Sequence, residues 1–127
     1  MKTLTYLYLP LLLILLVSCD KQEDASPESK VLEITMNQRS YTKSPQEIAV
    51  LIQKPNPCYA ISKVEKKVSG MTYSYNIVIE DRSQVCAAVM AEETVHVLFD
   101  PSTSGDYTLK FLINGKLAET RQVTVIE

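Results

Sequence analysis

Two segments in the C-terminal half of the chain alternate apolar and polar residues with a period of two. Between positions 106 and 113 the odd positions hold Tyr, Leu, Phe and Ile, whereas positions 106, 108 and 110 hold Asp, Thr and Lys. The dipeptide Asn114-Gly115 follows, and Val123 and Val125 share one face of the returning segment. Asn-Gly favours a two-residue hairpin turn, because both central residues of a type I′ turn need a positive φ. Successive side chains of a strand point to opposite faces, so this region is predicted to form a hairpin with one buried face.

The same pattern recurs upstream and sets the fold class. Residues 71–80 place one set of apolar side chains on one face (Met71, Tyr73, Tyr75, Ile77 and Ile79). Short apolar runs broken by turn signals predict further strands at 31–36, 58–68, 85–90 and 94–99, the second of them bulged because its alternation is poor. The chain shows no βαβ alternation and no convincing amphipathic helix. We therefore expect an all-β domain, a single antiparallel sandwich of about seven or eight strands.

One segment leaves two alternatives open. Residues 47–54 have the apolar centre Ile48-Ala-Val-Leu-Ile52, which fits a strand. The preceding Ser44-Pro45-Gln46-Glu47 also fits a helix capping box with proline in the first turn. Only about eight residues separate Pro45 from the next proline and β-branched residues are common, so we favour a strand.

The first twenty residues are predicted to be an export signal. Met1-Lys2-Thr3 carries one positive charge, and residues 4–17 (LTYLYLPLLLILLV) are almost wholly apolar. A membrane span needs about 20 apolar residues, whereas this run is shorter and is followed closely by charged residues. The pattern is typical of the hydrophobic region of a signal peptide, with a membrane helix as the alternative.

The end of the apolar run resembles the lipobox of bacterial lipoproteins. Leu16-Val17-Ser18-Cys19 has the large aliphatic residue, tolerant position, small residue and cysteine of that pattern. The resemblance implies cleavage of residues 1–18 and acylation of Cys19, although ordinary cleavage beside an incidental cysteine remains the alternative. The following Asp20–Asp24 run resembles the surface-export signal of Bacteroidota lipoproteins, or else is a plain solvated tether. These features predict an outer-membrane lipoprotein, facing the periplasm or the cell surface, with a flexible linker over residues 19–30.

The domain itself, residues 31–127, resembles immunoglobulin-like domains. Gly105-Asp106-Tyr107 looks like the Gly-x-Tyr entry of that family, which implies that Tyr107 packs at a corner and bonds a nearby backbone group. It also resembles small secreted bacterial domains that pair a Cys-Tyr strand with a later Val-Cys strand, here Cys58-Tyr59 and Val85-Cys86. The chain departs from the antibody pattern because it has no Trp and its domain cysteines are not at antibody spacing.

If Cys19 is acylated, Cys58 and Cys86 remain as an even pair. Exported proteins reside in compartments that permit disulfides, so a bridge is predicted, with two buried thiols as the alternative. The bridge would close a loop of 29 residues counting both ends. The chain-entropy model gives about 3.5 kcal/mol of stabilisation for a loop of this length.

Composition offers little for catalysis or for nucleic acid. Lys and Arg number 13 against 15 Asp and Glu, and a net charge of −2 gives no basic surface excess. The single histidine, His96, alternates with Val95 and Val97 and has no second histidine with which to bind a metal ion. The carboxylate pairs Glu80-Asp81 and Glu92-Glu93 flank predicted turns, where such groups stay solvated. We expect no enzymatic activity, no cofactor and no metal.

Three functions remain, and the first is favoured. A tethered sandwich without catalytic groups is expected to bind a protein partner through loops, such as 41–45 and 54–57, or through an exposed edge strand. The second is an inhibitor or stabiliser of an envelope protease, and the third is a carbohydrate-binding module. Tyr41, Tyr73 and Tyr75 are the candidate aromatic surface, although a same-face pair such as Tyr73 and Tyr75 more often lies in a core.

Overall fold

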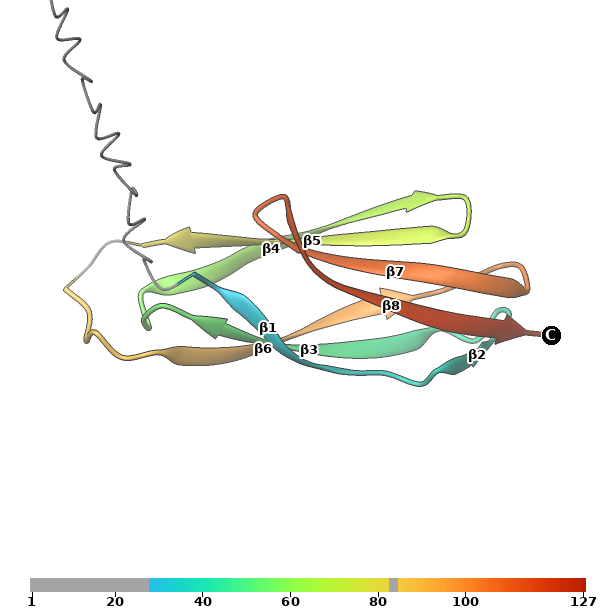
Figure 1. The fold of residues 1–127 in the computed structure, drawn as a ribbon, viewed down its shortest axis with the longest axis horizontal. Coiled ribbons are helices and arrows are strands. Elements are labelled where there is room, and N and C mark those ends of the chain that lie inside the picture. Colours follow the sequence, from blue (N-terminus) through green and yellow to red (C-terminus); the bar gives the residue numbers. More distant parts are fainter. Residues whose placement is uncertain (1–27, 83–84) are drawn as a thin grey trace, which may run out of the picture.

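The computed structural model describes residues 28–82 and 85–127, and within them the chain forms eight β-strands and no helix (Figure 1). The all-β sandwich expected from the sequence is confirmed. The predicted signal peptide and Cys19 lie outside the described residues. The strands are β1 (Lys30–Thr35), β2 (Arg39–Tyr41), β3 (Gln46–Lys54), β4 (Tyr59–Ser69), β5 (Thr72–Asp81), β6 (Ala91–Phe99), β7 (Gly105–Ile113) and β8 (Lys116–Ile126).

The strands form two sheets that enclose one apolar core. The first sheet has the order β1-β3-β6, and the second has the order β2-β8-β7-β5-β4. Every second side chain of β3, β5 and β7 is buried between the sheets, as the period-two patterns predict. Tyr75, Phe99 and Phe111 are the largest of the fully buried side chains.

Two of the strand pairs run parallel, so the expectation of a purely antiparallel sandwich is corrected. In the second sheet β5 lies parallel to β7, and β2 lies parallel to β8. The chain leaves β5, crosses to the first sheet as β6 and returns as β7, and these two crossings give β5 and β7 the same direction. Periodicity specifies which side chains are buried, but it does not specify which strand becomes a neighbour.

The segment that fitted both a strand and a helix is a strand. Ile48, Val50 and Ile52 in β3 have no exposed surface, and the backbone of β3 pairs with β1 on one side and β6 on the other. A central strand buried on one face accounts for the apolar β-branched run. The bulge predicted in the next strand is also present, between Ile61 and Lys63 of β4.

The strand predicted at 85–90 is wrong, and a short strand is added elsewhere. Residues 85–90 form a loop between β5 and β6. The run Val85-Cys-Ala-Ala-Val-Met90 has no polar residue with which to alternate, so it carries an apolar signal without a strand period. Conversely, β2 buries only Ser40 among its three residues, which is too little to leave a pattern in the sequence.

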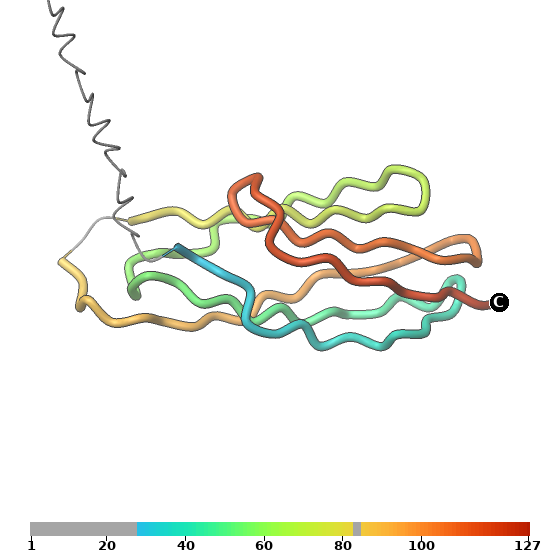
Figure 2. The backbone as a smooth tube through the Cα atoms, in the orientation of Figure 1, coloured from blue at the N-terminus to red at the C-terminus, as the bar shows by residue number. Residues whose placement is uncertain are grey.

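Figure 2 shows where the chain enters and leaves the sandwich. The 85–90 loop forms one tip of the molecule, and β1 begins toward the same end. The C-terminus lies at the opposite end.

Candidate functional site

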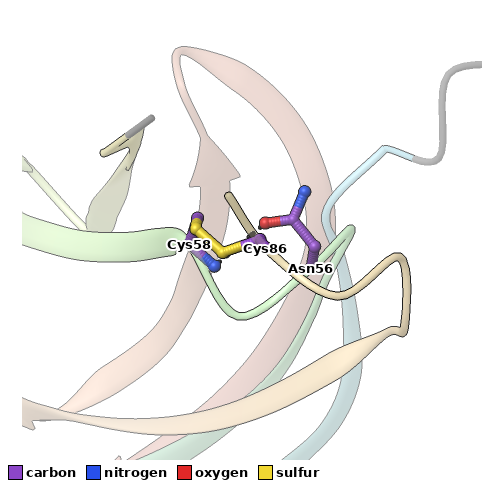
Figure 3. Close-up of a disulfide and its surroundings, with 3 residues drawn as sticks. All are labelled: Asn56, Cys58 and Cys86. Atoms are coloured by element: carbon purple, nitrogen blue, oxygen red, sulfur yellow. Dashed lines mark hydrogen bonds between the residues drawn. A yellow bond between two sulfur atoms is a disulfide. The ribbon is translucent and has the colours of Figure 1, made fainter. Parts of the chain in front are cut away.

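The predicted disulfide joins Cys58 to Cys86 and is confirmed (Figure 3). The two Cα atoms lie 5.9 Å apart, within the usual range for a bridge. The Cys58 amide donates to Oδ1 of Asn56 at 2.9 Å, and the Arg82 amide donates to the Cys58 carbonyl oxygen at 3.1 Å. The bridge therefore fastens the connection between β5 and β6 to the turn that precedes β4.

Tyr107 lies near the start of β7 and is 3% exposed. Its hydroxyl donates to the carbonyl oxygen of Thr103 at 2.9 Å, four residues upstream. Its ring packs edge-on against Tyr73 and Phe99, with ring centroids 5.8 and 5.4 Å away. This local hydrogen bond is of the kind that the immunoglobulin-like resemblance implies, and the position of Tyr107 is structural.

Tyr73 and Tyr75 belong to the core, which corrects their candidacy for a binding surface. They are 6% and 1% exposed, because the inner face of β5 packs against the first sheet. The Tyr75 hydroxyl donates to the Leu98 carbonyl oxygen at 2.7 Å, and the Tyr73 hydroxyl donates to that of Asp100 at 3.3 Å. Tyr41, in contrast, is exposed. The three tyrosines therefore do not form one aromatic platform.

Two of the titratable side chains that were candidates for catalysis, His96 and Glu93, form ion pairs. Nδ1 of His96 lies 2.8 Å from Oε1 of Glu47, and both side chains are exposed. Nζ of Lys54 donates to Oε2 of Glu93 at 2.8 Å. In residues 28–82 and 85–127, no group of three or more His, Cys, Asp or Glu side chains is arranged to hold a metal ion. Over the same residues, no helix is long and apolar enough to cross a membrane.

A groove of about 860 Å³ opens along one side of the sandwich, where the two sheets meet at β1 and β8. No sequence pattern marks this groove, because it depends on which strands lie at the edges of the sheets. A smaller hollow of about 590 Å³ lies between the starts of β1 and β8. The groove is lined by the end of β1, the β1–β2 connection, the first residue of β2, one residue of β7, and five residues of β8 (Ile34, Met36, Gln38, Arg39, Asp106, Thr120, Arg121, Gln122, Val123 and Thr124).

The wall of this groove includes backbone of β8 that no described strand pairs with. β8 has 11 residues, but β2 pairs only with residues 124–126. The Thr124 amide donates to the Gln38 carbonyl oxygen at 3.1 Å, so it points away from β7. In an antiparallel ladder, alternate residues of one strand direct their backbone groups to the same side. The peptide groups of Thr120 and Gln122 therefore face the groove.

The hydrogen bonds of β7 independently show that the backbone groups of Gln122 face the groove. Thr108 of β7 lies opposite Gln122, and its amide donates at 2.9 Å to the carbonyl oxygen of Met71, on the β5 side. Thr108 and Gln122 are thus a non-hydrogen-bonded pair of the β7–β8 ladder. The Gln122 amide and carbonyl therefore point away from β7, toward the groove.

A family model, the ORF11 beta-sandwich domain, matches residues 48–125. The chain belongs to this family. The ORF11 beta-sandwich match runs from β3 into β8, so it includes both cysteines of the disulfide and the β8 wall of the groove, whereas β1 and β2 precede it. No curated protein and no solved structure matches the chain.

The groove of this ORF11 domain has charged side chains at its rim. Arg121 lies opposite the buried Leu109 of β7, so it is on the inner face of β8, at the open side of the sandwich. It pairs with Glu119 at 3.7 Å, and both side chains are more than one-third exposed. Inward-pointing charges at an edge hinder indiscriminate strand pairing. Asp106 and Arg39 also line the groove.

Proposed function

We propose that this ORF11 beta-sandwich domain is the non-catalytic, protein-binding module of a bacterial outer-membrane lipoprotein anchored through acylated Cys19. The anchor is supported by the lipobox-like Leu16-Val17-Ser18-Cys19 and by the polar run between Cys19 and the first strand. Two or three acyl chains would hold the protein stably, whereas a single chain binds only marginally. The domain would then be presented to partners from the membrane surface.

The observation that carries the binding role is the open β8 edge. Thr120 and Gln122 direct peptide N–H and C=O groups into a groove of about 860 Å³. An exposed sheet edge binds an extended peptide by adding it as a strand, and flanking side chains give the specificity. The partner expected is therefore an extended segment of another protein that continues the second sheet beyond β8.

The carbohydrate-binding alternative loses its main support. Sugar binding through exposed tyrosines needs an aromatic platform, but Tyr73 and Tyr75 are buried. The protease alternative is distinguished by the identity of the bound partner.

Gln122→Pro tests the edge, with Gln122→Ala as the matched control. Proline removes the outward-pointing N–H without removing a β7–β8 ladder bond, and edge strands tolerate proline at such positions. Both variants lose the side-chain bond from Thr108 to Gln122, which measures 3.3 Å. A photoreactive residue at position 120 of the full-length protein should cross-link one partner protein in the alanine variant, and this product should be lost in the proline variant.

A second photoreactive position defines the background. Leu98 is 46% exposed and lies on β6 of the other sheet, so a photoreactive residue there should not give this product. Equal cross-linking in the proline and alanine variants would contradict strand addition. If the partner is a protease whose activity changes on binding, the domain acts as its inhibitor or stabiliser.

A further inference from the structure

The loop of residues 85–90 exposes an uninterrupted apolar run. Val85 is fully exposed, and Val89 and Met90 are 57% and 60% exposed. The two alanines between them are exposed as well, and no residue of the run is charged. Single exposed apolar side chains are common, but a contiguous set of them marks a surface that contacts a partner or a membrane.

This loop lies at the end of the sandwich where the tether arrives. Glu28 and Ser29 line one hollow together with Pro55 and Tyr59. Tyr59 follows Cys58, which is bonded to Cys86 in the loop. Figures 1 and 2 show the loop at the tip of this end, and the C-terminus at the other.

The length of the tether limits how far this end can be from a bilayer. Cys19 and Glu28 are nine positions apart, and at about 3.3–3.6 Å for each position the chain between them spans at most about 32 Å. A bilayer that holds acyl chains on Cys19 is therefore always within this distance of Glu28. At such an effective concentration, even a weak second contact is populated.

The flanking charges indicate how the loop would meet lipid. Arg82 precedes the loop, and Glu92 and Glu93 follow it, so the surroundings have no positive excess. Attraction to anionic headgroups therefore does not drive the contact. Burial of the apolar side chains drives the contact instead, and the charged flanking residues limit the depth of insertion to the interfacial layer.

We propose that residues 85–90 rest in the interface of the membrane that holds acylated Cys19, as a second contact braced by the Cys58–Cys86 bridge. This inference rests on the proposed lipid anchor. With its tip at the bilayer, the long axis of the sandwich points away from the membrane. The β8 groove then lies along the side, where an extended segment can reach it.

The chain has no Trp, so a single introduced tryptophan reports on its own position. Val89→Trp places it in the loop, and Leu98→Trp is the matched control on an exposed site of β6. Each full-length lipidated protein is reconstituted into phosphatidylcholine vesicles that carry a lipid-borne quencher. We expect the Val89→Trp emission to shift to the blue and to be quenched by the lipid, whereas the Leu98→Trp emission is quenched only by an aqueous quencher.

The anchor is measured separately by the mass of the acylated N-terminal peptide and by flotation with the vesicles. Acylated protein that floats, but whose Val89→Trp signal matches that of Leu98→Trp, overturns the loop contact and leaves the anchor intact. Protein that carries no acyl chain and does not float overturns both. Adding Val85→Asp and Met90→Asp should abolish the lipid quenching without reducing flotation, and undiminished quenching would also overturn the loop contact.

Discussion

At the scale of single residues, Tyr75 shows how the core uses a side chain that is both apolar and polar. Its ring stacks on Phe111 with centroids 5.5 Å apart, and its hydroxyl donates to the Leu98 carbonyl oxygen. Burial raises the pKa of the Tyr75 phenol well above its usual value, because the phenolate would lose its hydration, and the nearby Tyr73 and Asp100 act in the same direction.

This shift predicts a pH dependence of stability. The unfolded phenol titrates near pH 10, and the folded one titrates higher. Above about pH 10 the unfolded state releases its proton first, so the free energy of unfolding falls as pH rises, by up to about 1.4 kcal/mol per pH unit. Tyr75→Phe should lack this contribution. It should be less stable than the native protein by about 1 kcal/mol at neutral pH, through the lost hydrogen bond, and the difference should shrink above pH 10.

Urea unfolding at several pH values from about 8 to about 11 measures this difference. Tyr41→Phe is the matched control, because Tyr41 is exposed, and it should follow the native protein at every pH. If the free energy of unfolding of Tyr75→Phe stays below that of the native protein by the same amount at every pH, the ionisation of the buried phenol does not affect stability.

At the scale of elements, the turn between β7 and β8 does more than join two strands. Asn114 and Gly115 both have positive φ, 49° and 81°, as the predicted type I′ turn requires. The Asn114 side chain also accepts from the amide of Ile79 at 2.9 Å and donates to its carbonyl oxygen at 3.2 Å. The turn thereby locks the hairpin to β5.

Asn114→Ala should therefore destabilise the domain by about 2–3 kcal/mol, because it removes two hydrogen bonds and places alanine at a positive φ. Asn114→Gly is the control that separates these causes, since it loses the same hydrogen bonds but accommodates the backbone. Urea denaturation should rank the native protein, the glycine variant and the alanine variant in decreasing order of stability. Equal stability of all three would contradict a role for the turn side chain.

The elements that the sequence predicts well are those in which burial imposes alternation. β5 and β7 each bury every second residue, and both are read directly from the period of two. The strand predicted at 85–90 is wrong, because apolar residues normally indicate burial, whereas here Val85, Val89 and Met90 are not buried in the sandwich. β2 left no signal, because its three residues are held by backbone pairing to β8 rather than by an apolar face.

At the scale of the whole molecule, the sequence predicts a two-sheet sandwich but not its strand order. The parallel contact of β5 with β7 depends on a crossing through the first sheet, and no local pattern encodes it. The groove also follows from the strand order, because β2 pairs with only the last part of β8. The residues that face it, such as Thr120 and Gln122, are ordinary polar strand residues.

The disulfide acts on the whole molecule as well, because it constrains the unfolded chain. Cys58 and Cys86 are 28 positions apart, and their bridge links β4 to the connection that leads into the first sheet. The chain-entropy model gives a loss of about 3.5 kcal/mol on removing a loop of this size. A typical domain has about 5–15 kcal/mol of stability, so the Cys58→Ala/Cys86→Ala variant should remain folded.

Two quantities from urea unfolding test this expectation together. The double variant should lose about 3.5 kcal/mol, and its dependence on urea should become steeper, because an unfolded chain without the cross-link exposes more surface. Val89→Ala lies in the same loop but keeps the bridge, so its stability should stay within about 0.5 kcal/mol of the native protein. A double variant as stable as Val89→Ala would contradict the expectation, because it would show that the bridge does not stabilise the sandwich.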